Sequence, residues 1–375
     1  MTWPAWPDGP ARMARPRATL ATSHAQLREI SSRASLALLS HRVTTRPHDA
    51  LFRSAFEHPA DAAAELRHVL PRAIVDAIDW SQLRLEPGSF VDSKLADRHS
   101  DLLFSATIDG RPALVYLLFE HQSTPDARMP LRMLVYMVRI WERCTVDRPD
   151  EPLPPIIPVL LTHPTRGAPT PTRLHDIVRP APAGIPGLAE RVPDFLLAID
   201  DISAASDDEL RSRSLSVFPM LALSLLRDGR DEHALLANLE TWAAAYAAVA
   251  AAPTGLHAFE RLMRYVELRL SDEQFVRFRA RLIELVPTTE AMVMRYSERL
   301  IAEGEAKGRV EGRMEGRLEA QRDILRTQLA RKFGPLDAST LARVEAATPA
   351  ELDTWLERIV LADDLDGLFR TEPTH

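Results

Sequence analysis

Two neighbouring apolar segments in the first third of the chain have the pattern of paired strands. The first covers residues 100–108, the second covers residues 113–122, and Asp109 and Gly110 lie between them. Asp-Gly is typical of a two-residue hairpin loop. The second segment contains the unbroken apolar run 113–119, which is typical of a strand buried on both faces. The pattern therefore predicts an antiparallel hairpin within a core.

Acidic side chains stand near the open end of this hairpin. If the loop has two residues, Ile108 faces Arg111, and counting back places Asp101 and Glu120 on one face as diagonal neighbours. Their backbones would then be roughly 7–8 Å apart, which lets both carboxylates converge on one divalent cation. A longer or bulged turn, which Pro112 would permit, reverses this parity.

A structural explanation of Glu120 is equally open on spacing alone. A strand that is buried on both faces must end in polar residues where it reaches solvent, and Glu120 directly follows the apolar run 113–119. Gln122 would share the face of Glu120 because side chains alternate along a strand.

Residues 129–143 have helical periodicity and two distinct stripes. The predicted core-facing stripe comprises Leu131, Leu134, Val135, Val138 and Trp141 or Glu142. The other stripe comprises Arg132, Tyr136, Arg139 and Arg143. Its arginines could pair with phosphates, with Tyr136 as a stacking or packing surface, or the stripe could simply be a solvated helix face.

The other elements predicted around this hairpin are one helix and two strands. We expect a helix over 49–70, a strand over 85–91 and a strand over 156–161, in which Pro158 indicates an edge position or a strand end. The Pro- and Gly-rich residues 163–190 predict a long irregular excursion.

The second half of the chain is predicted to be helical and contains a four-residue repeat. In residues 303–319, glycine, arginine, an apolar residue and glutamate each recur every fourth position. Like charges then stack along a helix, and each glycine costs about 1 kcal/mol relative to alanine. An isolated helix would be weak, so the segment is either a helix that associates with a second copy or a flexible charged tether.

Composition narrows the class of protein. The chain has 375 residues and a formal net charge of −7, which is unlike a nonspecific nucleic-acid coat. It contains a single cysteine, Cys144, which excludes an internal disulfide framework and favours the cytoplasm. The chain contains no uncharged apolar run of the roughly 18 residues that a membrane helix needs, so we expect no membrane partner.

Several short sequence motifs in the first two thirds of the chain resemble those of the Rpn family of recombination-promoting nucleases, also called YhgA-like putative transposases. The resemblance covers roughly residues 46–250. It rests on Pro-His-Asp-Ala-Leu-Phe at 47–52, Ile-Asp-Trp at 78–80, Pro-Gly-Ser-Phe-Val at 87–91, His-Ser-Asp at 99–101, Tyr-Leu-Leu-Phe-Glu-His-Gln-Ser at 116–123 and Tyr-Met-Val-Arg-Ile-Trp at 136–141. The words at 331–335 and 355–358 are similar to a C-terminal domain of unknown function that is often joined to these nucleases.

The resemblance implies an α/β fold with a PD-(D/E)xK, restriction-endonuclease-like αβββαβ core and helical additions. Asp101 and Glu120 would be catalytic ligands of Mg²⁺, with Mn²⁺ or Ca²⁺ as alternatives. Gln122 would fill the position where the wider superfamily usually carries lysine, and a neutral amide can orient a water molecule but cannot offset negative charge. Arg53 would correspond to a base that approaches the scissile phosphate, and structurally it is equally a surface residue.

The resulting hypothesis is a Mg²⁺-dependent DNA endonuclease of the cytoplasm. It would assemble as a homo-oligomer through residues 302–319 and the C-terminal module. Two alternatives stay open: a nucleic-acid-associated scaffold with weak or no catalysis that assembles through its C-terminal helices, and a DNA-joining transposase. The predicted organisation is a poorly ordered extension (1–45), a nuclease-like α/β core (46–200), a helical appendage (201–300), the repeat as helix or linker (301–322) and a helical module (323–372).

Overall fold

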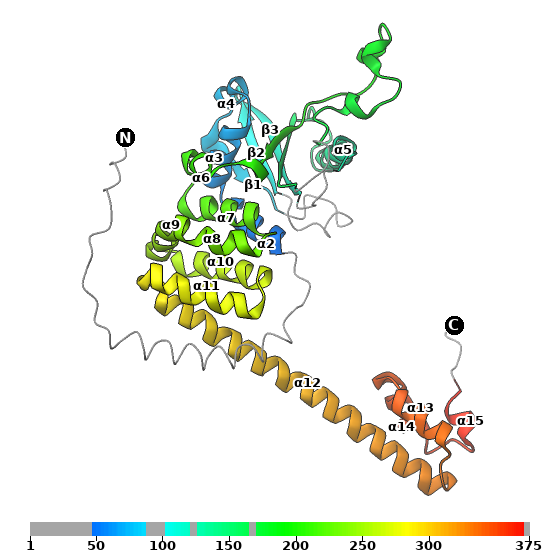
Figure 1. Cartoon of the computed structure of the whole chain (residues 1–375). Coiled ribbons are helices and arrows are strands. Elements are labelled where there is room, and N and C mark those ends of the chain that lie inside the picture. Colours follow the sequence, from blue (N-terminus) through cyan, green and yellow to red (C-terminus); the bar gives the residue numbers. More distant parts are fainter. Residues whose placement is uncertain (1–46, 88–101, 121–125, 165–169, 371–375) are drawn as a thin grey trace, which may run out of the picture. The chain divides into compact units, whose positions relative to one another are not determined.

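The computed structural model describes residues 47–87, 102–120, 126–164 and 170–370 (Figure 1). The described residues up to Glu298 belong to one compact unit, and those from Arg299 belong to a second. The predicted extension 1–45 and most of the predicted strand 85–91 lie outside the described residues.

A five-stranded mixed sheet forms the centre of the first unit. Its order follows the sequence, the first two pairings are antiparallel, and the last two are parallel. The strands are β1 (Arg84–Leu85), β2 (Leu102–Ile108), β3 (Arg111–Glu120), β4 (Ile156–Thr162) and β5 (Ala198–Asp201). The predicted α/β class is therefore confirmed, whereas β5, which has only four residues, was not predicted.

The predicted two-residue hairpin loop is confirmed. Ile108 faces Arg111, and the pairing continues to Leu102 opposite Leu117. Asp109 and Gly110 have φ angles of 49° and 75°, the left-handed backbone that a hairpin turn of this length requires at both positions. The turn chemistry thus sets the register of the whole hairpin.

Strand β4 is an interior strand, but Pro158 lies in a part of it that is paired on one side only, which agrees with the prediction of an edge position or a strand end. β4 lies between β3 and β5. Pro158 pairs with Tyr116 on the β3 side, but pairing with β5 begins only at Val159, opposite Ala198. A proline without an N–H group is tolerated because it precedes the segment that has strands on both sides.

The predicted helix 49–70 is two helices, α2 (Pro47–Phe56) and α3 (Pro59–Val69), which are followed by α4 (Arg72–Ala77). The break comes at His58, which has φ −83° and ψ 122°. Pro59 disfavours the helical conformation in the residue before it and provides no N–H group for a continuing helix.

Helix α5 (Met129–Asp147) turns a different stripe to the sheet than we predicted. Leu131, Val135 and Val138 are 45%, 40% and 41% exposed. The buried stripe comprises Met129, Met133, Tyr136, Met137, Ile140 and Cys144, which pack on β2, β3 and β4. Both stripes have helical spacing and lie on opposite sides of α5, so periodicity alone does not choose between them.

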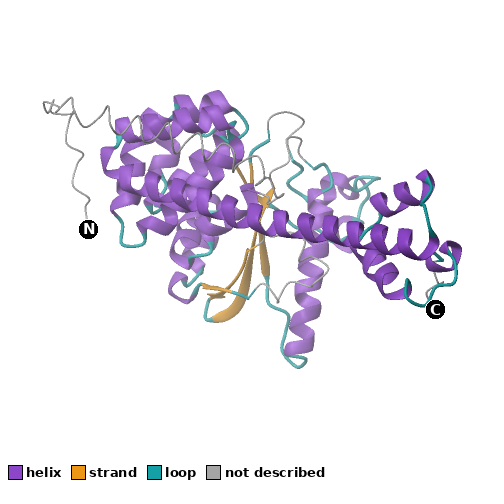
Figure 2. Cartoon of the chain, turned by 90° about the horizontal axis from the view of Figure 1, so that it is seen from below, coloured by secondary structure: helices purple, strands orange, loops and turns teal. Residues whose placement is uncertain are grey.

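Further helices complete the first unit, and two of them, α7 (Val217–Asp228) and α10 (Gly255–Arg269), lie against α2 (Figures 1 and 2). The others are α6 (Asp207–Ser212), α8 (Glu232–Ala237), α9 (Leu239–Ala251), α11 (Asp272–Leu285) and the start of α12 (Glu290–Phe333). Short 3₁₀ helices are η1 (Trp80–Gln82), η3 (Leu174–Ile177), η4 (Pro182–Gly184), η5 (Ala189–Arg191), η6 (Ile202–Ala204) and η7 (Pro287–Thr289). No helix among the described residues is both long enough and apolar enough to span a membrane.

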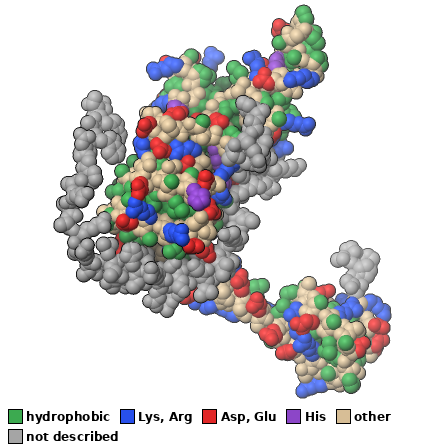
Figure 3. Space-filling view, in the orientation of Figure 1, with side chains coloured by type: hydrophobic (Ala, Val, Ile, Leu, Met, Phe, Trp, Pro, Cys, Tyr) green, Lys and Arg blue, Asp and Glu red, His purple; other side chains and the backbone are tan. Residues whose placement is uncertain are grey.

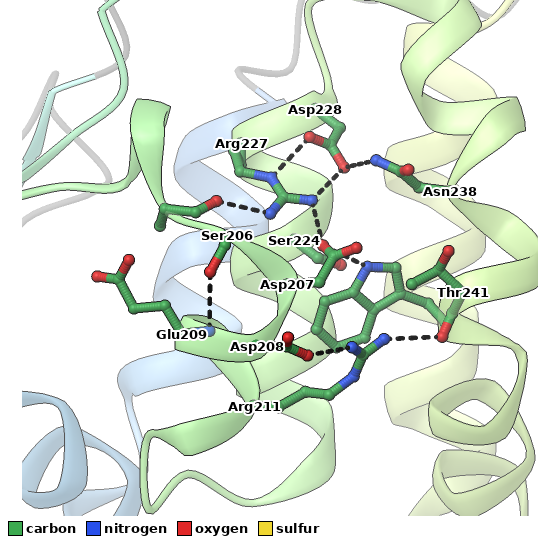
Figure 4. A network of polar contacts seen from close by, with 12 residues as sticks. Ser206, Asp207, Asp208, Glu209, Arg211, Ser224, Arg227, Asp228, Asn238 and Thr241 are labelled. Atoms are coloured by element: carbon green, nitrogen blue, oxygen red, sulfur yellow. Dashed lines mark hydrogen bonds and ion pairs between the residues drawn. The ribbon is translucent and has the colours of Figure 1, made fainter.

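Arg227 links the first helices of this bundle (Figure 4). Its guanidinium donates two hydrogen bonds to Asp228 at 2.7 and 2.9 Å, and one each to Asp207 at 2.7 Å and the Ala205 carbonyl at 2.8 Å. Burial lowers the pKa of Arg227, but its bonds to Asp228 and Asp207 outweigh that effect and raise the pKa. Arg227 therefore stays charged and joins α7 to the start of α6.

The second unit has its own apolar core. Helices α13 (Ala338–Ala346), α14 (Pro349–Arg358) and α15 (Leu365–Leu368) pack on the C-terminal part of α12. Leu325 and Leu329 of α12 are fully buried, and Trp355 packs edge-to-face on Phe369 with ring centroids 4.7 Å apart. These helices lie in the segment that the sequence predicts to be a C-terminal helical module.

Candidate functional site

The candidate site lies at the open end of the β2–β3 hairpin. Glu120 is the last residue of β3, and its backbone pairs with Thr162 of β4, which in turn pairs with Asp201 of β5. Asp101, Gln122 and the side chain of Glu120 lie outside the described residues. The predicted register is confirmed over every described pair from Ile108 to Leu102, and the convergence of the two carboxylates stays a prediction.

A buried wall supports this end of the sheet. Val115, Tyr116 and Leu117 of β3 are fully buried, and so are Val159 and Leu160 of β4. Apolar contacts on both faces fix such strands in one register, since a slip of one residue would turn each side chain to the opposite face. The buried residues 115–117 of β3 and 159–160 of β4 therefore keep these two strands in one register.

The N-terminus of α5 is organised by Asp126. Its carboxylate accepts a hydrogen bond from the Arg128 backbone N–H at 2.8 Å and forms an ion pair with Arg132 at 2.9 Å. The Asp126 and Arg132 side chains are 22% and 21% exposed. Arg132 thus helps to hold the turn that enters α5.

The predicted nucleic-acid-binding stripe is not one exposed surface. Tyr136 is 4% exposed and packs edge-to-face on Tyr116 at 5.7 Å, so it is a packing residue and its predicted use as a stacking surface is wrong. Arg139 is half-buried, whereas Arg143 is exposed and pairs with Asp147 at 2.9 Å. Arg53, on α2, is half-buried.

A buried histidine pair lies just beyond β4. His163 is 2% exposed, and its ring centroid lies 5.4 Å from that of His48 on α2. The Tyr265 hydroxyl lies 3.1 Å from His48 Nδ1, and burial raises the pKa of Tyr265. The sequence analysis did not single out His163. Its position directly after a buried strand, together with His48 in the Pro-His-Asp word, was the available signal.

A second buried polar cluster joins the sheet to the helices. Arg213 donates hydrogen bonds to both Asp200 oxygens, at 2.7 and 3.1 Å, and to Glu65 at 2.8 Å. Burial, together with a hydrogen bond and negative charge from Asp200, raises the pKa of Glu65 well above its ordinary value, although Arg213 lowers it. The Arg213 side chain is fully buried and bonds both carboxylates, so the cluster ties the helices to the sheet.

A cavity beside the sheet lies at the other end of β3. This cavity of about 430 Å³ is lined by Arg111, Pro112, Cys144 and Arg148, among others. Because β3 begins at Arg111 and ends at Glu120, this cavity is separate from the candidate site. Within the residues that the structure describes, no three His, Cys, Asp or Glu side chains come together as a metal-binding group.

The visible surface carries charges of both signs. On the face in Figure 3, acidic and basic side chains are interspersed over the helices and do not gather in one basic patch. This distribution agrees with the net charge of −7 and gives no sign of a broad basic face on the side shown.

Comparison with known proteins identifies the family. The model of the family described as "Putative transposase, YhgA-like" matches residues 46–250, more than half of the chain, and the chain belongs to this family. The match spans the sheet, α5 and the first helices of the bundle. No solved structure matches the chain.

The relatives of this chain include named recombination-promoting nucleases, which confirms the Rpn resemblance. The chain is 28% identical over 263 residues to the recombination-promoting nuclease RpnD of Escherichia coli O157:H7, covering 70% of this chain and 96% of that protein. It is 27% identical over 275 residues to RpnA of the K12 strain, covering 71% and 87%. The K12 protein named inactive recombination-promoting nuclease-like protein RpnE is 26% identical over 266 residues, covering 71% and 85%.

Proposed function

We propose that this chain is a divalent-metal-dependent DNA endonuclease of the recombination-promoting type, with a PD-(D/E)xK core, which acts in the cytoplasm. The observation that carries the proposal is the hairpin register, in which Ile108 faces Arg111 and Leu102 faces Leu117. This register leaves Asp101 as the residue before β2 and Glu120 as the last residue of β3. The names of the relatives supply the reaction class.

Asp101 and Glu120 would hold the cation. Two carboxylates are a donor set suited to hard cations such as Mg²⁺, Mn²⁺ and Ca²⁺, which take oxygen ligands. A bound cation would supply positive charge beside the scissile phosphate and make water a better nucleophile. The Gln122 amide would orient the attacking water by hydrogen bonding, and α5 and β4 would hold the hairpin in place.

Nicking of supercoiled plasmid tests the proposal. The purified full-length protein should nick plasmid with Mg²⁺ or Mn²⁺ and not with chelator, and Ca²⁺ serves as a third metal. Asp101→Ala and Glu120→Ala should each lower the nicking rate by a factor of about 100 or more, because one carboxylate does not hold the cation productively. Asp109→Asn is the matched control, since Asp109 lies at the opposite end of the same hairpin and asparagine tolerates its positive φ.

The outcomes separate three cases. Loss of nicking in both alanine variants, with Asp109→Asn active and all three variants folded by circular dichroism, supports the site. Unchanged nicking in both alanine variants contradicts the site assignment. No nicking by the parent protein with any of the three metals contradicts the enzyme proposal.

Substitutions of Gln122 test whether its amide orients the attacking water or binds the metal ion. Gln122→Ala should lower turnover by a factor of about 10 to 100 and leave metal affinity unchanged, because its proposed task is to position water. Gln122→Lys should retain or raise activity, since it restores the charge usual in the superfamily. Calorimetric titration with Mn²⁺ measures the affinity. Loss of metal binding in Gln122→Ala would show that the amide is a ligand.

A scaffold without useful catalysis is the second candidate function. Two observations favour it: Gln122 replaces the usual lysine, and the relative RpnE is named inactive. On this alternative the protein binds DNA without cleaving it. A gel-shift experiment with plasmid fragments, run beside the nicking assay, would then give binding without cleavage, whereas an active nuclease gives both.

A further inference from the structure

The four-residue repeat of α12 has an ordered arrangement of side chains around the helix. α12 runs without interruption from Glu290 to Phe333 and includes the whole repeat. Successive residues of a helix are rotated by about 100° around its axis. Measured from the glycine column, the arginine column lies at about 100°, the apolar column at about 200° and the glutamate column at about 300°. The apolar column therefore lies opposite the glycines, with arginine on one flank and glutamate on the other.

The apolar column is exposed in the middle of the repeat. Val310 and Met314 are 54% and 66% exposed, whereas Leu318 packs in part against the core of the second unit. On the opposite side, a methyl group added at Gly308, Gly312 or Gly316 would meet no heavy atom within 4 Å. The helix therefore presents an apolar strip that the described part of the chain does not cover.

The period of four leaves charges in the middle of the repeat without an opposite partner along the helix, although Glu311 pairs with Lys307 at 3.6 Å at its start. Residues three and four apart are neighbours on a helix surface. Arg313 has Arg309 and Arg317 four residues away, and Val310 and Gly316 three residues away. Glu315 is likewise flanked by Glu311 and Glu319. Opposite charges for these side chains must come from another helix.

We propose that residues 306–319 form a parallel two-helix contact with a second copy of this chain, with Val310 and Met314 at its centre. In a parallel pair related by a two-fold axis along the helices, the arginine flank of each copy lies beside the glutamate flank of the other. In an antiparallel pair, arginine would meet arginine and glutamate would meet glutamate. Charge complementarity therefore selects both the partner and its direction.

The contact uses the apolar face and not the glycine face. Glycines permit close approach, but that side of α12 offers no apolar surface to bury at positions 308, 312 and 316. A period of four drifts by about 40° per repeat, so straight helices keep their apolar columns in contact for only a few turns. The contact is therefore short and depends strongly on its flanking charges.

A charge-exchange experiment on the full-length protein tests the contact. Arg309→Glu with Arg313→Glu makes both flanks acidic, and Glu311→Arg with Glu315→Arg makes both basic. Light scattering should give the mass of two chains for the parent protein and the mass of one chain for each double variant alone. An equimolar mixture of the two double variants should recover the doubled mass. A double variant that keeps the parent mass on its own, or a mixture that does not recover that mass, would overturn the proposal.

Cysteine crosslinking tests the direction and the face. Cys144 is the only cysteine and is buried, so Cys144→Ser provides a background without a thiol. Ala306→Cys, at one end of the apolar column, should form a disulfide-linked dimer on mild oxidation, because parallel copies bring equal positions together. Gly308→Cys is the matched control on the opposite face and should stay monomeric on denaturing gels. Crosslinking at 308 and not at 306 would contradict the proposed face.

Discussion

Arginine and carboxylate side chains serve different purposes in the two units. In the first unit, Arg213 is fully buried and bonds Glu65 of α3 and Asp200 of β5, which are distant in the sequence. In the repeat of the second unit, Arg313 is exposed, and its neighbours four residues away are arginines. In the first arrangement the arginine pairs with two carboxylates of its own chain, whereas in the second Arg313 has no opposite charge three or four residues away on its helix.

The difference shows how spacing decides what a charge can do. The desolvation cost of an arginine buried between elements is offset only if several carboxylate oxygens accept hydrogen bonds from it. Such a cluster fixes how those elements pack. Charges at a period of four on one helix have no opposite neighbour on that helix. The first pattern therefore specifies the fold of one chain, and the second favours association between chains.

The largest expected effect comes from removing the buried arginine. Arg213→Met should lower the free energy of unfolding by about 3–5 kcal/mol, because it leaves Glu65 and Asp200 buried without their cation. Arg313→Met, the same change in the repeat, should alter it by at most about 0.5 kcal/mol. Urea denaturation followed by tryptophan fluorescence measures both variants. Equal effects would contradict the contrast between the two patterns.

The next effect concerns a glycine of the first unit. A Cβ atom at Gly229 would lie 1.8 Å from the Tyr265 hydroxyl and 2.7 Å from the Leu225 carbonyl oxygen. The backbone oxygen does not move away easily, and displacing Tyr265 breaks its contact with His48. Gly229→Ala should therefore lower the free energy of unfolding by about 1–3 kcal/mol. A melting temperature equal to that of the parent protein would show that the bundle relaxes around this position.

The pH dependence of stability tests the state of Glu65. Burial and Asp200 raise its pKa above the ordinary value of 4.5, so the folded state holds the proton more tightly than the unfolded state. The resulting stabilisation is complete below the ordinary pKa and is lost as pH rises through the raised pKa. One proton allows a slope of at most about 1.4 kcal/mol per pH unit.

Glu65→Gln is the control for that pH dependence. Glutamine resembles the protonated acid in shape and lacks the titration, so the variant should lose this part of the slope while staying folded. Urea denaturation at a series of pH values above 4.5 provides the measurement. A variant with the same slope as the parent protein would assign the pH dependence to other groups.

The sequence predicted the elements whose signals are local. Asp109 and Gly110 identified the hairpin loop, and the apolar run 113–119 identified β3. It did not predict which face of α5 is buried, because Met133 and Val135 belong to two apolar stripes of similar strength. The four residues of β5 are too few to show strand alternation.

The same limit applies to the sites. Local turn chemistry was sufficient to predict the register that brings the ends of β2 and β3 together. The Arg213–Glu65 bond joins residues 148 positions apart, and His48 packs against His163, which is also far away in the sequence. Such contacts depend on how the helices pack on the sheet, which no short pattern in the sequence encodes.

The smallest expected effect has the opposite sign and concerns a glycine of the repeat. Gly312 is helical, and an added methyl group would meet no heavy atom within 4 Å. Gly312→Ala should therefore stabilise α12 locally by about 1 kcal/mol, since alanine restricts the unfolded chain and favours the helix. Hydrogen exchange of the amides around position 312 measures this local stability. Slower exchange with an unchanged molecular mass agrees with a contact on the apolar face, whereas faster exchange or a lower mass would show that the glycine face is packed against a partner.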